Sequence, residues 1–119
     1  MNYNAQVGRF GEALARKYLL KKGYKIIGQN VKLSYQEIDL VTKRKNQIIF
    51  IEVKTRTSDS FGQAEEAMTQ AKIGKLKKAR NHYLVVNNFD PEQVRFDLLA
   101  IDIDRVKKIA KIKHYLDIF

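Results

Sequence analysis

The sequence predicts one α/β domain over residues 1–119, with an αβββαβ order of elements and a mixed sheet flanked by helices. Two stretches, one near the N-terminus and one in the middle, carry apolar residues at the spacing of amphipathic helices. The stretches between and after them are rich in Ile, Val and Phe, and their alternating or continuous apolar character is typical of strands. A chain of 119 residues has room for one modest core, so a single domain is expected.

The first helix is predicted over residues 5–22. Its expected apolar face consists of four residues spaced by three or four positions: Val7, Phe10, Leu14 and Tyr18. Glu12 lies off that face, between Arg9 and Arg16. A surface ion pair worth roughly a few tenths of a kcal/mol would explain it, and the residues alone do not decide between that pair and a functional role.

Three strands are expected after this helix. The first covers 24–27 and, after an interruption at Gly28, continues in extended form over 30–34. The second covers 36–42, and the basic turn 43–47 connects it to the third. Because that connection is short, the second and third strands are expected to form a hairpin and to lie side by side.

The third strand, 48–54, carries two of the candidate functional residues. It is continuously apolar from Ile48 to Ile51, as a buried strand is, and then places Glu52 and Lys54 on one face. A charge at the end of a buried strand is costly unless it is paired or binds a metal. The simple interpretation is a Glu52–Lys54 ion pair, and the more specific one is part of a magnesium-dependent site that cleaves phosphodiesters.

The specific interpretation needs a second carboxylate from the neighbouring strand. In 36–42, Ile38 and Leu40 are expected to face one side, and Glu37, Asp39 and Val41 the other. Asp39 is the candidate, whereas Glu37 is expected to be structural. Asp39 can meet Glu52 only if the antiparallel register is suitably staggered, and the sequence leaves that register open.

The second helix is predicted over 69–86. Its buried face consists of apolar residues at helical spacing: Ile73, Leu76, Ala79, Tyr83 and Leu84. Gly74 is expected to permit close packing. The opposite face carries Lys75, Lys78 and His82, and no acidic residue occurs between positions 67 and 89. An exclusively basic face suits a phosphate backbone, although a solvated lysine face is common on any helix.

The remaining segments carry weaker signals. A polar loop is expected over 55–62, where Arg56 could contact substrate or belong to a plain connection. A strand is expected over 94–103, in which Asp97 is most simply paired with Arg95 on the same face. The tail 105–119 fits either a helix or an edge strand and is basic in both cases.

Composition narrows the classes of function. The net charge of +10 predicts a polyanionic partner, with nucleic acid ahead of an anionic membrane. Cysteine is absent, which excludes disulfides and thiolate metal sites. No apolar run has membrane-spanning length and the N-terminus does not resemble a signal peptide, so the cytoplasm is the expected location.

The order of elements, with Asp39 followed by Glu52-Val53-Lys54, resembles the PD-(D/E)XK nucleases, whose fold is restriction-endonuclease-like. A closer resemblance, to the bacterial YraN family, covers nearly the whole chain. It is carried in order by several segments: Gly8-Arg9-Phe10-Gly11-Glu12, Gly23-Tyr24, Glu37-Ile38-Asp39-Leu40-Val41, Phe50-Ile51-Glu52-Val53-Lys54-Thr55-Arg56 and Arg95-Phe96-Asp97. The chain departs from the pattern of that family at one position. Gln36 stands where the family usually has glycine, and it places a side chain before Asp39.

The resemblance implies a distant similarity to archaeal Holliday junction resolvases, in which a glutamate of the first helix joins the site. Glu12 is the matching position. Asp39 and Glu52, with the Val53 carbonyl, would hold one Mg²⁺ or Mn²⁺ ion, and Lys54 would orient the attacking water. Four cationic side chains would contact phosphates: Arg56, Lys72, Lys75 and Lys78.

Three functions remain open from the sequence. The first is a metal-dependent endonuclease acting on structured or branched DNA, for which cutting two strands would require a homodimer or two separate events. The second is a non-catalytic nucleic-acid-binding module in which the acidic residues form only an ion-pair network. The third is a protein-interaction adaptor built on the same scaffold.

Overall fold

The computed structural model describes residues 3–57 and 69–119, with side chains from residue 5. Two helices and five strands follow in chain order: α1 (Tyr3–Lys21), β1 (Lys25–Leu33), β2 (Gln36–Arg44), β3 (Gln47–Thr57), α2 (Gln70–Asn87), β4 (Val94–Asp104) and β5 (Ile109–Tyr115). A short 3₁₀ turn, Pro91–Gln93, precedes β4. Residues 58–62 of the predicted loop, and residues 63–68 after it, lie outside the described residues.

All five strands belong to one mixed sheet in the order β1-β2-β3-β4-β5. β3 and β4 are parallel, and the other neighbouring pairs are antiparallel. This arrangement confirms the predicted α/β fold and is consistent with a restriction-endonuclease-like core. The undecided tail forms β5, an edge strand along β4 in which Ile112 packs against the core beneath α1.

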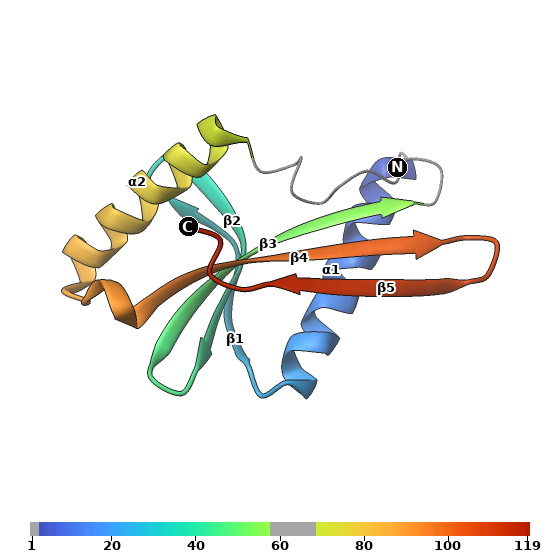
Figure 1. Ribbon diagram of the computed structural model, residues 1–119, viewed down its shortest axis with the longest axis horizontal. Coiled ribbons are helices and arrows are strands. Elements are labelled where there is room, and N and C mark those ends of the chain that lie inside the picture. The colour runs from blue at the N-terminus through green and yellow to red at the C-terminus, as the bar shows by residue number, and fades with distance from the viewer. Residues whose placement is uncertain (1–2, 58–68) are drawn as a thin grey trace.

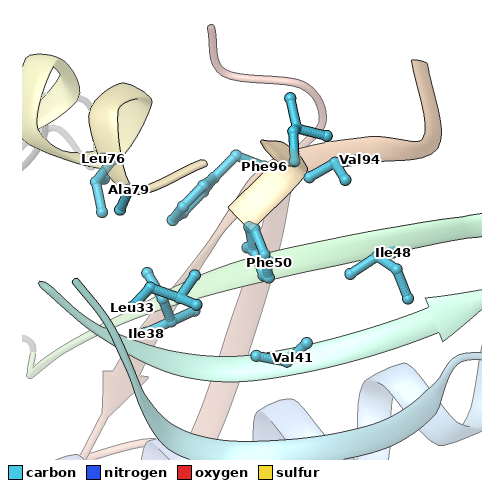
Figure 2. Close-up of a cluster of buried hydrophobic side chains, with 10 residues drawn as sticks. Leu33, Ile38, Val41, Ile48, Phe50, Leu76, Ala79, Val94 and Phe96 are labelled. Atoms are coloured by element: carbon cyan, nitrogen blue, oxygen red, sulfur yellow. The ribbon is translucent and has the colours of Figure 1, made fainter. Parts of the chain in front are cut away.

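The two helices cover different parts of the sheet. Helix α1 lies against β1, β3 and β4, whereas α2 lies against β1 and β2 (Figure 1). Beneath α2, Leu76 and Ala79 pack toward Phe50 and Phe96 of the sheet (Figure 2). Side chains of β3 therefore alternate between the α2 side, which includes Phe50, and the α1 side, which includes Ile51.

The buried face of α1 differs from the predicted one. Phe10 is 54% exposed, while the buried positions are Gly11, Ala15 and Leu19. The reason is close approach, because a Cβ atom at Gly11 would overlap the side chain of Thr55 in β3. Small residues face the sheet at this contact, and the larger apolar residues flank it.

The ends of α2 lie close to the predicted positions. Thr69 caps the N-terminus, where its hydroxyl accepts a hydrogen bond from the Lys72 backbone N–H at 3.1 Å. Asn88 ends the helix in the left-handed conformation, with φ of 58°. Gly74 is exposed, and a Cβ atom there would meet nothing within 4 Å, so the expectation that it permits close packing is wrong.

The sheet divides into two branches in the middle. The β2–β3 ladder ends at the pair Leu40↔Ile51, whereas β3 continues beside β4 as far as Thr57↔Ile103. Strand β2 in turn remains paired with β1 as far as its first residue, Gln36. We call the divergence of β2 and β3 beyond Leu40 and Ile51 the fork. Figure 1 shows β1 and β2 running from it toward α2, away from β3, β4 and β5.

Candidate functional site at the fork

Asp39 lies at the fork, one residue beyond the last β2–β3 pair. Its Oδ2 atom accepts a hydrogen bond from the Val53 backbone N–H at 2.8 Å, which satisfies a donor that β2 no longer pairs. The expected alternation of β2 is wrong here. Ile38 packs on the α2 side but Leu40 packs on the α1 side, so the backbone turns at Asp39 as the strands separate.

Glu52 follows the last paired residue of β3. The register that pairs Leu40 with Ile51 brings Asp39 and Glu52 to corresponding positions of the two strands. The sequence had left this register open. The Oε1 atom of Glu52 lies 2.7 Å from Nζ of Lys72 on α2. Glu52 therefore forms its ion pair with a helix residue, and the simple interpretation of a Glu52–Lys54 pair does not hold.

Lys54 extends from the same face of β3, two residues after Glu52. Its side chain is exposed, and it forms no ion pair with the residues that the structure describes. Its ammonium group is thus unpaired on the strand face that also carries Glu52.

The electrostatics of Asp39 reflect its neighbours. Its pKa is raised from 3.8 to about 6, chiefly by burial and then by the negative charge of Glu52, with a smaller contribution from Glu12. The Val53 N–H and the Lys72 ammonium act in the opposite direction. Asp39 and Glu52 are therefore close enough to repel each other, and the available positive charge compensates this repulsion only in part.

Glu12 belongs to α1, which packs on β3, and its charge is one of the smaller causes that raise the pKa of Asp39. It is half-buried and follows Gly11, the residue that packs on Thr55. Within the described residues it forms no ion pair with Arg9 or Arg16, and Arg16 instead donates a hydrogen bond to Gln29 at 3.3 Å. The surface pair with Arg9 or Arg16 is therefore not formed in the part of the chain that the structure describes.

The donors at the fork fit a divalent cation. Asp39 and Glu52 offer hard carboxylate oxygens, and the raised pKa of Asp39 indicates negative charge that a cation would offset. No group of three or more His, Asp or Glu side chains converges anywhere in residues 3–57 and 69–119. A cation would thus depend on two carboxylates, with backbone carbonyl and water oxygens as its other ligands.

The predicted phosphate-binding residues divide into two groups. Lys75 and Lys78 are exposed on α2, whereas Lys72 is held by Glu52. Arg56 lies in β3 rather than in a loop, because the strand continues to Thr57. Its Nε lies 3.5 Å from Oδ1 of Asp102 in the paired strand β4, and its side chain is only 12% exposed. This ion pair explains Arg56 without a substrate.

Asp97 belongs to a separate, buried network. It is 0% exposed and accepts two hydrogen bonds from Arg95 at 2.8 Å, which confirms the predicted pair. Nε2 of His114 lies 2.8 Å from it, and the Asp117 N–H donates to it at 2.9 Å. Although burial alone would raise its pKa, the hydrogen bonds from His114 and Arg95 hold the pKa of Asp97 below its usual value. Asp97 is therefore a structural residue.

Comparison with known proteins identifies the family. The model of "Uncharacterised protein family UPF0102" matches residues 11–101. The chain belongs to family UPF0102. A UPF0102 protein of Syntrophomonas wolfei is 46% identical over 117 residues, covering 98% of this chain and 99% of that protein. A UPF0102 protein of Caldanaerobacter subterraneus is 44% identical over 114 residues, covering 95% and 93%.

A more distant UPF0102 protein, from Flavobacterium psychrophilum, is 41% identical over 113 residues, covering 95% of this chain and 92% of that protein. These matches confirm the predicted family, since UPF0102 is the YraN family. The names of the matched proteins state no activity. In the part of this UPF0102 chain that the structure describes, no helix has the length and apolar character needed to cross a bilayer.

Two features of the site region were not predicted from the sequence. The Lys72–Glu52 ion pair joins residues twenty positions apart, and nothing in their spacing indicates it. Tyr35, in the turn between β1 and β2, is 96% exposed. An aromatic residue in a tight turn between two strands is the signal that could have drawn attention to it.

Proposed function

We propose that this UPF0102 protein is a metal-dependent endonuclease that hydrolyses phosphodiester bonds of structured or branched DNA. The observation that carries the proposal is the placement of Asp39 and Glu52 at corresponding positions of the fork, where burial and then the charge of Glu52 raise the pKa of Asp39 to about 6. A carboxylate whose pKa is shifted by burial together with a neighbouring charge marks a candidate functional site. The proposal includes a cytoplasmic location, where DNA is accessible.

The acidic residues would supply the ligands for the ion. Asp39 and Glu52, with the Val53 carbonyl, would hold Mg²⁺ or Mn²⁺, and Glu12 would assist from the α1 side through water. When bound, such an ion lowers the pKa of a water molecule and stabilises negative charge on the phosphate. Asp39 must be ionised for this role, so the protein would work best above about pH 6.

The cationic residues would act on the substrate. Lys54 would orient the attacking water, whose oxygen bonds to phosphorus as the P–O bond to the leaving group breaks, and would offset the developing negative charge. Lys72 is held by Glu52 here, and it lies one helical turn before Lys75. It is therefore within reach of a phosphate that approaches the fork along α2.

The alternative is a non-catalytic nucleic-acid-binding module. It is favoured by the Lys72–Glu52 ion pair, which already satisfies one of the two carboxylates without a metal. In that case the basic face of α2 would bind nucleic acid, and the fork would serve only to join the helix to the sheet.

Cleavage of labelled nucleic acids separates the two functions. Four-way junctions, flaps, single strands and duplexes of DNA and RNA would be incubated with Mg²⁺ or Mn²⁺ and with wild type, Lys54→Ala or Lys43→Ala. Lys43 is an exposed lysine of the same hairpin, away from the fork. Metal-dependent cleavage that is lost only in Lys54→Ala is the expected result. Equal cleavage by all three proteins, or none, would favour the binding module.

A further inference from the structure

A hollow of about 450 Å³ opens between α2 and the turn that joins β1 to β2. Three of its lining residues belong to the turn and the start of β2, and three belong to the helix: Ser34, Tyr35, Gln36, Lys75, Lys78 and Ala79. Its volume lies within the usual range of sites for small organic ligands. Gln36, the first residue of β2, contributes to this hollow.

Tyr35 is the unusual member of the lining. It is 96% exposed, so neither burial nor packing explains an aromatic ring at this position. The turn itself makes no demand for one, since its constrained residue is Ser34, which has φ of 57°. Single exposed aromatic residues are common on protein surfaces, and the helix on the other side of the hollow distinguishes this one.

That helix presents only positive charge to the hollow. Lys75 and Lys78 are exposed, and among the residues that the structure describes no carboxylate belongs to the lining. The whole of α2, from Gln70 to Asn87, contains no acidic residue. A flat ring opposite two ammonium groups matches a ligand that carries both an aromatic face and phosphate charge.

The hollow lies close to the fork along two separate elements. On α2, Lys72 contacts Glu52, and Lys75 and Lys78 follow it by about 4.5 and about 9 Å of helix axis. On β2, Gln36 precedes Asp39 by three residues, or about 10 Å. A nucleic-acid strand bound in the hollow would therefore extend toward Asp39 and Glu52.

We propose that the hollow binds an unpaired nucleotide, with its base stacked on Tyr35 and the neighbouring phosphates held by Lys75 and Lys78. The proposal rests on the proposed function for the polymer being a nucleic acid, and it narrows the substrate to one with a single-stranded segment beside the cleavage site. Within a duplex the base faces are covered by neighbouring bases, so a protein ring can stack only where a base is unpaired.

A single tryptophan makes the stacking visible. The chain contains no Trp, so Tyr35→Trp introduces the sole indole, and Phe10→Trp on α1 is a matched control at another exposed aromatic position. In EDTA, oligothymidylate is expected to quench the Tyr35→Trp emission while a blunt duplex changes it little, and neither affects Phe10→Trp. Equal responses to both DNAs at position 35, or none to oligothymidylate, would overturn the inference.

Affinity provides the second test, again in EDTA so that cleavage plays no part. Tyr35→Ala should bind oligothymidylate about 5- to 100-fold more weakly than wild type, whereas Tyr35→Phe retains the ring and should bind nearly as tightly. Binding to the blunt duplex should change by less than about twofold. If the protein shows this binding pattern but never cleaves, the stacking inference stands and the nuclease proposal fails. If single-strand binding does not depend on Tyr35, the stacking inference fails even when the protein is a nuclease.

Discussion

Nζ of Lys72 lies 2.7 Å from Oε1 of Glu52, which ties the first turn of α2 to β3 at the fork. Among the described residues, Lys72 is also the side chain whose positive charge lowers the pKa of Asp39. The helix that carries the basic face is thus coupled electrostatically to the acidic residues. A substitution at Lys72 should therefore change the pKa of Asp39.

Replacing Lys72 by methionine removes this charge. The pKa of Asp39 should then rise above about 6, because the opposing charges of Glu52 and Glu12 remain. Carboxyl ¹³C chemical shifts followed against pH would report it. Lys75→Met, one turn further along α2, is the matched control and should leave the titration of Asp39 nearly unchanged. Identical curves for both variants would show that the Lys72 charge has little influence.

Asp39→Asn should stabilise the fold at neutral pH. The folded pKa is raised from 3.8 to about 6, so the stability that the protonated group contributes is complete below about pH 4 and is lost as pH rises through about 6. The amide avoids this loss, on the order of 2 kcal/mol, and its oxygen can still accept from the Val53 N–H.

Urea unfolding at pH 4 and pH 7.5, without divalent metal, would measure this difference. The variant and wild type should be similar at the lower pH and diverge at the higher one. Glu37→Gln, at an exposed carboxylate of the same strand, should show no such pH dependence. A constant difference between Asp39→Asn and wild type at both pH values would contradict the raised pKa.

The same glycine-to-alanine change should have opposite effects in the two helices. Gly11→Ala forces a methyl group into Thr55 and should destabilise the protein by about 1–3 kcal/mol. Gly74→Ala meets no atom within 4 Å and should stabilise it by about 1 kcal/mol. Thermal unfolding of both variants would test the prediction, and a loss of stability in Gly74→Ala would show that the contact of α2 is closer than described.

Removing Lys75 and Lys78 together should weaken nucleic-acid binding and flatten its dependence on salt. Each phosphate contact contributes roughly 0.7–0.9 to the slope of log affinity against log salt concentration, so the double Gln variant should lose up to about 1.8. Fluorescence anisotropy at several salt concentrations would measure it. Lys111→Gln with Lys113→Gln on β5 removes the same charge and should change the slope less. Equal changes would indicate attraction to net charge alone.

Local patterns predicted much of this protein. The apolar run 48–51 indicated a buried strand, and the short basic turn indicated the hairpin that pairs it with the strand of Asp39. Periodicity also located both helices within a few residues.

What the sequence did not predict depends on contacts between distant residues. The large side chain of Phe10 appeared to mark the buried face of α1, but the close approach of Thr55 selects Gly11 instead. Alternation failed at Asp39, because the strands separate there. Arg56 was expected in a loop, yet pairing with Asp102 in β4 extends the strand past it.

The most direct test of a metal site at the fork is to measure the binding of Mn²⁺ at pH 7.5 by electron paramagnetic resonance. Wild type, Asp39→Asn and Glu37→Gln would be titrated in parallel, since the two carboxylates lie two residues apart and only Asp39 is at the fork. Wild type and Glu37→Gln are expected to bind the ion, and Asp39→Asn is expected not to bind it. Binding that survives in Asp39→Asn, or that is absent from wild type, would contradict a metal site between Asp39 and Glu52.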